Sequence, residues 1–536
     1  MSQFIEMNND NNMFIEKFIS FNDVSIQNEL INSPFLSSET KFGLLSLKAK
    51  SVPITTKLQD FVFTVDCSGS MSDLCSDLRS KMDHIIHTLK NIIYYFHENT
   101  INTFITIYAF DDIIYNIVER TNITDDNLEE LLYKISKIRP RNSTDIEKAL
   151  KNAKEYISTI KVSYPETNIS HIFMTDGDVT SGSSNSTVLL SNVDETVNNA
   201  FIGFGVGHND KLLIDISAGN KSSYHFVDKL ENSGFVYGEI LHNILYNLLT
   251  NIELSINDGL IYDYNSNNWV SKIRIKEISS ESNKIYALIT IVPDLCYAEI
   301  NAKTTTHKND DIDFNLVITD KQKLPQQKIE IQIFRIRVLQ LLFDVNHYHK
   351  TKFISRGWFL NRPKTVDENK ENKKNYKKHL NDLFDEIKQY MTENSLSDDK
   401  TLKSLCDDIY ISLKTFDKKY GGMYTCGRLV SQGSQRCYTV SNTPNDIYEQ
   451  NEDEPVQDTN LQQTMNMTRG FLSLKPIRNR FNLNHHLSEF DDSPYLTPSA
   501  RQVMRSVSDQ DSSNKTTSQN PVLLDDFYLS DDESQK

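Results

Sequence analysis

The sequence predicts an α/β fold: a doubly wound, mostly parallel sheet with an added antiparallel β-domain, a helical hairpin and a disordered C-terminal tail. Three observations support this prediction. Between residues 60 and 250, short apolar runs alternate with helical patterns, as the elements of a doubly wound sheet do. From 251 to about 335, short strand-like runs are separated by Asn, Asp and Ser, which is typical of antiparallel β-structure. Beyond residue 439 the chain is polar and has no lasting periodicity, which indicates disorder.

These patterns divide the 536 residues into five segments. They are an Asn-rich, disordered N-terminal segment at 1–38, an α/β domain at 39–250 with its core at 60–250 and a preceding strand at 41–53, a β-rich domain at 251–335, a helical region with a Gly-rich break at 336–438, and a disordered acidic tail at 439–536.

The α/β domain begins with an apolar strand at Phe61–Val65, followed by apolar residues at three- and four-residue steps from Leu78 to Phe96, which predict an amphipathic helix. The same criteria predict strands at 103–110, 113–118, 169–174, 200–206 and 224–227, and helices at 126–138, 145–160 and 234–249.

The helical region is less regular. Ile329–Tyr348 starts like a strand and continues as a helix. Two helices, at 376–393 and 400–419, are interpreted as a hairpin. Paired glycines then break the pattern in Tyr420–Tyr438, and we expect this stretch to fold back onto the β-domain.

The stretch that carries the chemistry is Phe61–Asp73, FVFTVDCSGSMSD. Asp66 follows the buried strand, Ser68 and Ser70 come at two-residue intervals, and a helix is expected to begin near Ser72 or Asp73. This corner of a parallel sheet is where ligands bind. One carboxylate and two hydroxyls at alternate positions of a tight loop can converge on a hard cation.

Asp66–Ser70 resembles the DxSxS signature of von Willebrand factor A-type (VWA) domains, whose metal site is the metal-ion-dependent adhesion site. Two further segments of the family follow in order: Asn142–Ile146 with Ala149-Leu150 resembles its G-G-T-N-I-x-x-A-L loop, and Ile172–Gly177 resembles its strand ending in T-D-G. The family also often places a strand such as 41–53 ahead of the first sheet strand when a β-rich region follows. The three segments together indicate an intact metal site.

The resemblance implies that Asp66, Ser68, Ser70, Thr144 and Asp176 hold a metal ion. Oxygen-only ligands suit Mg²⁺, with Mn²⁺ or Ca²⁺ as alternatives. In the family, a Glu or Asp of a protein partner completes the metal shell. Two departures are Asn142-Ser143 in place of Gly-Gly and Asp145 in place of Asn, which adds negative charge near the metal.

The sequence leaves other functions open. A Mg²⁺-dependent phosphoryl-transfer hydrolase is the enzymatic alternative, but that class needs a second Asp two residues after the first, where this chain has Ser68. No G-x-S-x-G elbow surrounds the serines and no P-loop is present. The third alternative is a scaffold that uses the β-domain and the tail. We expect an interaction module and no catalytic residues.

Composition limits the partners and the compartment. A net charge of −16 disfavours non-specific binding to nucleic acid. No run of eighteen apolar residues and no signal peptide is visible, so we expect no membrane span. Six cysteines lack C-x-x-C spacing, which argues against a zinc ribbon or RING and for reduced thiols. A cytoplasmic or nuclear protein is therefore expected; its partner and oligomeric state are left open.

Overall fold

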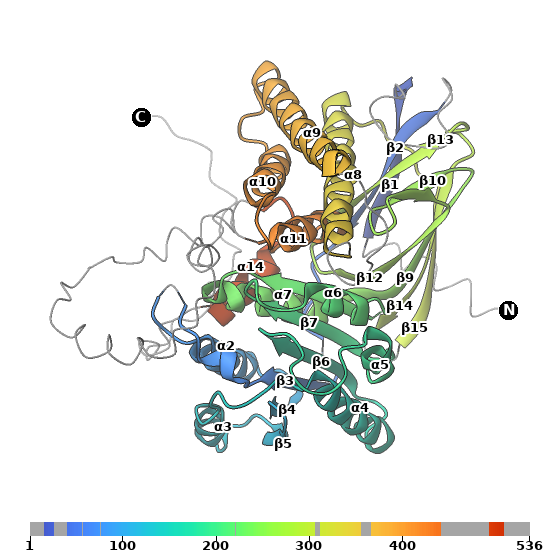
Figure 1. Ribbon diagram of the computed structural model, residues 1–536. Coiled ribbons are helices and arrows are strands. Elements are labelled where there is room, and N and C mark those ends of the chain that lie inside the picture. The colour runs from blue at the N-terminus through green and yellow to red at the C-terminus, as the bar shows by residue number, and fades with distance from the viewer. Residues whose placement is uncertain are drawn as a thin grey trace, which may run out of the picture.

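The computed structural model describes residues 15–25, 40–55, 57–75, 77–219, 221–305, 311–354, 366–440 and 493–508. Three parts pack against one another: an α/β domain with a six-stranded sheet, a β-sandwich and a group of helices (Figure 1). The predictions of disorder for 1–38 and 439–536 fall partly outside these residues.

The six-stranded sheet has the order β5-β4-β3-β6-β7-β8, and every pair is parallel except β4 with β5. The doubly wound, mostly parallel sheet is thus confirmed. Its strands are β3 (Gln59–Asp66), β4 (Thr103–Phe110), β5 (Ile114–Asn122), β6 (Asn168–Thr175), β7 (Asn198–Phe204) and β8 (Ser222–Val227). Its helices are α2 (Lys81–Glu98), α3 (Leu128–Ile135), α4 (Ile146–Ser163), α5 (Ser186–Ser191), α6 (Asp210–Ile216) and α7 (Ser233–Leu245).

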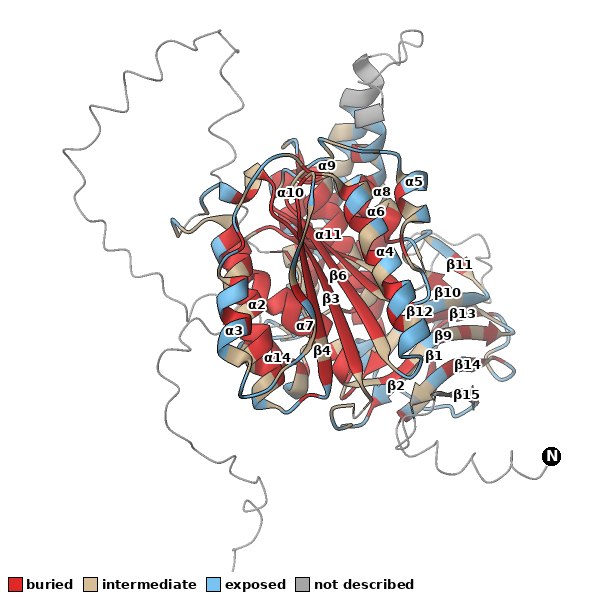
Figure 2. Ribbon diagram, turned by 90° about the horizontal axis from the view of Figure 1, so that it is seen from below, coloured by how far each residue is buried: buried red, intermediate tan, exposed pale blue. Residues whose placement is uncertain are grey.

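Helices cover both faces of this sheet, so its central strands are buried along their length (Figure 2). Alternate residues of β3 face opposite sides. Phe61 and Phe63 belong to the core shared with α2 and α7, whereas Val62 packs with Ile157 and Ile160 of α4. A strand that is covered on both faces reads as a continuous apolar run, which is why the sequence identifies it.

The first helix starts later than predicted. A 3₁₀ turn occupies Gly69–Ser72, and α2 begins only at Lys81, after a capping box between Ser80 and Asp83. The chain comes back close to Asp73 at the start of α2, since the Lys81 N–H donates to the Asp73 carbonyl at 3.0 Å. The sequence places the cap at Ser72 or Asp73, and that prediction is wrong.

The β-sandwich consists of a five-stranded sheet, β1-β2-β13-β10-β11, and a four-stranded sheet, β12-β9-β14-β15. Its strands are β1 (Ile15–Ser25), β2 (Lys41–Ala49), β9 (Asn247–Asn257), β10 (Leu260–Asp263), β11 (Asn268–Val270), β12 (Lys272–Ser279), β13 (Asn283–Thr290), β14 (Tyr297–Thr305) and β15 (Asp311–Ile318).

The N-terminal strands correct two predictions. β1 lies within the segment predicted to be disordered, and it pairs antiparallel with β2. β2 was expected to belong to the α/β domain, yet it pairs with β13 over its whole length and belongs to the sandwich. Leu45 and Leu47 face the other sheet, while Phe42 and Leu44 face the helices. The N-terminal segment therefore completes the β-domain.

The described part of the helical region has four helices: α8 (Gln326–Ile354), α9 (Val366–Glu393), α10 (Lys400–Thr415) and α11 (Gly421–Ser434). α9 and α10 are the two helices of the predicted hairpin, and they pack against each other. α8 is helical from its start, so the strand-like reading of Ile329 onward is wrong. The expected return to the β-domain is present, because the Gln435 side chain accepts from the Ile285 N–H at 2.9 Å.

A helix within the predicted tail packs on the α/β domain. α14 (Pro498–Ser508) buries Ala500, Val503, Met504 and Val507, and it lies against α7 (Figure 1). A Cβ on Gly238 of α7 would collide with the Met504 Cα, so this glycine lets the two backbones approach closely. Residues 498–508 are thus an ordered part of the domain, contrary to the prediction for 439–536.

We expect Val503→Ala to loosen α14. The change removes two buried methyl groups and should lower the stability of the α14–α7 contact by about 2 kcal/mol. Amide hydrogen exchange in α14 should become faster. Gln502→Ala on the exposed side of the same helix is the control, and equal exchange in the two variants would show that α14 is not held by this apolar contact.

Candidate functional site

The predicted site residues lie at the carboxyl end of the six-stranded sheet, where three loops meet. Asp66 ends β3, and Ser68 and Ser70 lie in the turn that follows. Thr144 precedes α4, and Asp176 follows β6. Because β3 and β6 are parallel neighbours, their carboxyl ends bring Asp66 and Asp176 to the same edge.

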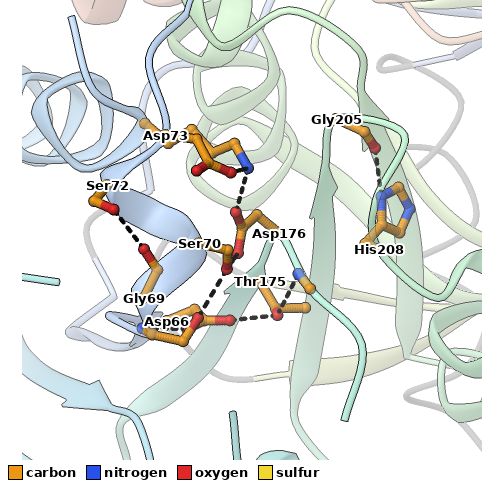
Figure 3. A network of polar contacts seen from close by, with 12 residues as sticks. Asp66, Gly69, Ser70, Ser72, Asp73, Thr175, Asp176, Gly205 and His208 are labelled. Atoms are coloured by element: carbon orange, nitrogen blue, oxygen red, sulfur yellow. Dashed lines mark hydrogen bonds and ion pairs between the residues drawn. The ribbon is translucent and has the colours of Figure 1, made fainter. Parts of the chain in front are cut away.

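Hydrogen bonds connect four of the five residues (Figure 3). The Ser70 hydroxyl donates to Asp176 Oδ1 at 2.7 Å and lies 3.1 Å from the Ser68 hydroxyl. Asp66 Oδ1 accepts from the Ser68 N–H at 2.8 Å, and its Oδ2 accepts from the Thr175 hydroxyl at 2.5 Å. Both oxygens of Asp66 are therefore held in place before any ligand arrives.

Thr144 lies beside Ser70, because the hydroxyls of both residues are close to Gly177. A Cβ on Gly177 would lie 3.6 Å from Ser70 Oγ and 3.7 Å from Thr144 Oγ1, so both hydroxyls approach this glycine. The loop before α4 is held to the loop after β6, because the Thr144 N–H donates to Thr180 Oγ1 at 2.7 Å. Among the described hydrogen bonds, none joins Thr144 Oγ1 to the other four candidate ligands.

Backbone hydrogen bonds also hold the loop before α4 to the loop after β3. The Arg141 N–H donates to the Cys67 carbonyl at 2.7 Å, and the Gly69 N–H donates to the Asn142 carbonyl at 3.0 Å. Cys67 itself is buried in the apolar core, which raises the pKa of its thiol to about 12. Its side chain packs in that core, and no described hydrogen bond joins it to the five candidate ligands.

The two acidic neighbours of the site differ. Asp145 caps α4, since its Oδ1 accepts from the Lys148 N–H at 2.9 Å, so its carboxylate is directed to the helix N-terminus. Asp178 is exposed to solvent.

Lys81 is a side chain of the candidate site that sequence reasoning missed. Its Nζ lies 2.6 Å from Asp176 Oδ2 and 3.1 Å from Asp73 Oδ2. Burial lowers the pKa of Lys81, but the two carboxylates more than offset this and raise it above its usual value. Lys81 comes here because α2 begins only at Lys81, next to the Asp73 carbonyl, and a helix predicted to start at Ser72 or Asp73 does not place it there.

The charges at the site are only partly balanced. Burial, together with repulsion from Asp176, raises the pKa of Asp66 to about 6, although hydrogen bonds from Thr175 and Ser68 oppose the rise. The Lys81 ammonium pairs with Asp176, whereas no ion pair with a described cation is formed by Asp66. The arrangement thus favours additional positive charge beside Asp66.

The donor set fits a hard metal ion. The two carboxylates and three hydroxyls supply oxygen ligands only, the kind that Mg²⁺, Mn²⁺ and Ca²⁺ prefer. Within the described ranges, no group of three or more His, Cys, Asp or Glu residues could hold a metal. A metal at this edge would therefore depend on the hydroxyls as well as on Asp66 and Asp176.

Comparisons with known proteins agree with this architecture. Residues 60–238 match the family model of the von Willebrand factor type A domain. Over 238 residues the chain is 26% identical to inter-alpha-trypsin inhibitor heavy chain H3 of Rattus norvegicus, a match covering 41% of this chain. The match covers 24% of that relative, so this chain spans about a quarter of its length.

Similar solved structures include the ArnB paralog VWA2 from Sulfolobus acidocaldarius, at 14% identity and a TM-score of 0.44, covering 79% of this chain and 100% of that one. Another is a von Willebrand factor type A protein from Catenulispora acidiphila, at 12% identity and a TM-score of 0.40, covering 63% and 80% of the two chains. VWA domains commonly serve as metal-dependent protein-interaction modules. Residues 60–238 of this chain, which carry the site at Asp66, form a von Willebrand factor type A domain.

Proposed function

We propose that this protein is a metal-dependent interaction module in which Asp66, Ser68, Ser70, Thr144 and Asp176 hold Mg²⁺. The observation that carries the proposal is the convergence of two buried carboxylates and three hydroxyls at one edge of the sheet. When bound, the ion would supply a positive charge that attracts a carboxylate. We further propose that a Glu or Asp of a protein partner provides that carboxylate.

The chain's own residues are suited to positioning. Asp66 is fully buried, and both its oxygens accept hydrogen bonds from Ser68 and Thr175. A carboxylate held in this way can orient a ligand, whereas a nucleophile for phosphoryl transfer needs a free oxygen facing the substrate. Binding is therefore better supported than a hydrolase, and we propose that the chain is not an enzyme.

We also propose a cytoplasmic or nuclear compartment for this protein, and the free cysteines support it. All six lie in the described part of the chain, and each is a free thiol there. Burial raises the pKa of Cys296 and of Cys426 to about 11, so these thiols resist oxidation. In the same residues, no helix combines the length and apolar character that a bilayer crossing requires.

The test is calorimetric titration of the full chain with Mg²⁺. We expect saturable binding by the wild type and no detectable binding by Asp66→Asn, because the substitution removes one of the two buried charges. Asp178→Asn, which removes an exposed charge two residues from Asp176, is the matched control and should bind like the wild type. Equal binding by both variants would exclude Asp66 as a ligand.

Partner capture tests the second part of the proposal. Immobilised wild-type chain should retain a partner in Mg²⁺ and release it in EDTA, and Asp66→Asn should retain none. Substituting the acidic residue of that partner should abolish capture. A partner that stays bound in EDTA would show that recognition uses another surface, such as the β-sandwich.

A further inference from the structure

A large cavity lies at the opposite edge of the six-stranded sheet from Asp66. It has a volume of about 670 Å³, within the range of small-molecule sites. Residues at the amino ends of parallel strands line it, namely Gln59 of β3, Asn168 of β6 and Asn198 of β7. The cavity is thus separate from the proposed metal site.

All three parts of the molecule contribute to its wall. His225 and Glu239 come from the α/β domain, Lys276 and Lys284 from the sandwich, and Arg335 from α8. Tyr495, close to the start of α14, also lines it. A ligand here would touch every part of the fold at once.

The wall is basic, although the chain as a whole carries a net charge of −16. Seven lysine or arginine residues line the cavity, against three aspartate or glutamate residues. The basic residues are Lys57, Lys221, Arg274, Lys276, Lys284, Arg335 and Arg436, and the acidic ones are Asp263, Glu239 and Glu277. Positive charge is therefore concentrated on the wall of this cavity.

Four of these cations are held by neutral groups. Lys284 donates to the carbonyls of Ser434 and Gln435, and Arg436 donates to the Tyr224 carbonyl at 2.8 Å. Lys276 donates to the Ser222 carbonyl. Arg335 donates to the Gln432 carbonyl at 2.8 Å, and its Nε has no hydrogen-bond partner although the side chain is 4% exposed. None of the four forms an ion pair with a described carboxylate.

The cations oppose one another. Lys276 lines the cavity and is exposed there. Desolvation by the surrounding wall, with repulsion from Arg436, lowers its pKa to about 8. Burial, together with Arg436 and Lys276, lowers the pKa of His225 well below its usual value. Repulsion among these positive charges destabilises the protein without a ligand, and a bound anion would reduce that repulsion.

We propose that this cavity binds a small organic polyanion, a molecule that carries several phosphate or carboxylate groups. Lys276, Lys284 and Arg436 would pair with the anionic groups, and the unpartnered Arg335 Nε offers a further donor. The cavity is much larger than a single inorganic ion needs, and Tyr264, Tyr286 and Leu339 supply apolar surface for an organic body. Because the wall is shared, the ligand fastens the sandwich and the helices to the α/β domain.

The experiment titrates the full chain, in EDTA and at constant ionic strength, with pyrophosphate, citrate and ATP. EDTA separates the result from metal binding at Asp66, so this test and that of the proposed function can fail independently. We expect saturable binding of at least one probe and a rise in melting temperature. Preference for citrate would indicate a carboxylate ligand, and preference for pyrophosphate or ATP a phosphorylated one. Binding of none of the three would overturn the proposal.

Lys276→Gln is the informative variant, and Lys272→Gln, on the same strand but outside the cavity, is its control. Loss of one charged hydrogen bond should weaken probe binding about tenfold in Lys276→Gln and leave Lys272→Gln unchanged. Without a probe, Lys276→Gln should melt at or above the wild-type temperature, because repulsion is relieved. Equal binding by both variants, or a lower melting temperature for Lys276→Gln without a probe, would overturn the assignment.

Discussion

Replacing Lys81 by Met should make the stability of this protein depend on Mg²⁺. The Lys81 ammonium lies 2.6 Å from Asp176, whose side chain is completely buried. Removing one partner of a buried ion pair leaves an uncompensated charge and costs about 3–5 kcal/mol. In Lys81→Met, Asp66 and Asp176 would face each other without this cation, so the metal-free protein should be strongly destabilised.

Mg²⁺ should restore much of that loss. A ligand that binds only the folded state stabilises it by mass action, and a divalent ion at Asp176 would replace the missing charge. In the wild type, a metal bound at Asp176 would have to displace or repel the Lys81 ammonium. Lys81→Met should therefore bind Mg²⁺ about tenfold more tightly, since one ion pair of about 1.4 kcal/mol is no longer lost on binding.

Thermal denaturation in EDTA and in Mg²⁺, combined with calorimetric titration, checks both effects. Lys81→Met should have the lowest melting temperature in EDTA and the largest rise with Mg²⁺. Lys90→Met, on the same helix and away from the site, is the control. A melting temperature of Lys81→Met that does not respond to Mg²⁺ would contradict metal binding at Asp176, and weaker Mg²⁺ binding would show that Lys81 assists the ion.

The central part of the fold and the meeting of the five candidate residues at one edge of the sheet could be predicted because their signals are local. The strand before Asp66 is an unbroken apolar run, and the parallel order of β3 and β6 then brings Asp66 and Asp176 to one edge. Lys81 could not be found in this way. Its position depends on the path of residues 73–80, which is fixed by backbone contacts such as that between Lys81 and Asp73.

The remaining errors have different physical causes. β1 is a strand because it pairs with β2, and a polar, Asn-rich context hides that pairing. α8 has apolar residues on several sides because it packs against both the sheet and other helices, so Ile329, Ile331 and Phe334 do not give a helical stripe. α14 is short and distant in sequence from α7, and only the close approach at Gly238 reveals why it docks.

His171→Gln should remove an acid-sensitive contribution to the stability of the six-stranded sheet. His171 lies on β6, where Nε2 is 3.0 Å from the Thr64 hydroxyl and Nδ1 is 3.3 Å from Asn199 Oδ1. Burial lowers its pKa to about 4. Because the carbonyl oxygen of Asn199 can only accept, Nδ1 carries the proton of the neutral ring and donates it.

The sign follows from the two pKa values. Unfolded histidine has a pKa of about 6.5, so the unfolded chain takes up the proton first as the pH falls. The stabilisation is complete above pH 6.5 and is lost progressively down to pH 4. At pH 5 the loss from His171 should be about 2 kcal/mol, because each pKa unit is worth about 1.4 kcal/mol.

The comparison must be made between variants, because other groups act in the opposite direction. Burial raises the pKa of Asp66 and of Asp408 to about 6, and these carboxyls favour the folded state as the pH falls. They are present in both wild type and His171→Gln, so their contribution cancels in the difference. The difference in pH dependence between the two proteins therefore reports the proton uptake of His171 itself.

Native-state amide hydrogen exchange in β6 measures the effect where it arises. Between pH 7.5 and 5, the free energy of opening of β6 should fall about 2 kcal/mol further in the wild type than in His171→Gln. His97→Gln, near the end of α2 and next to the exposed Asp125, is the control and should follow the wild type. Parallel pH profiles for wild type and His171→Gln would mean that His171 accepts a proton without opening the sheet, which its burial between Thr64 and Asn199 argues against.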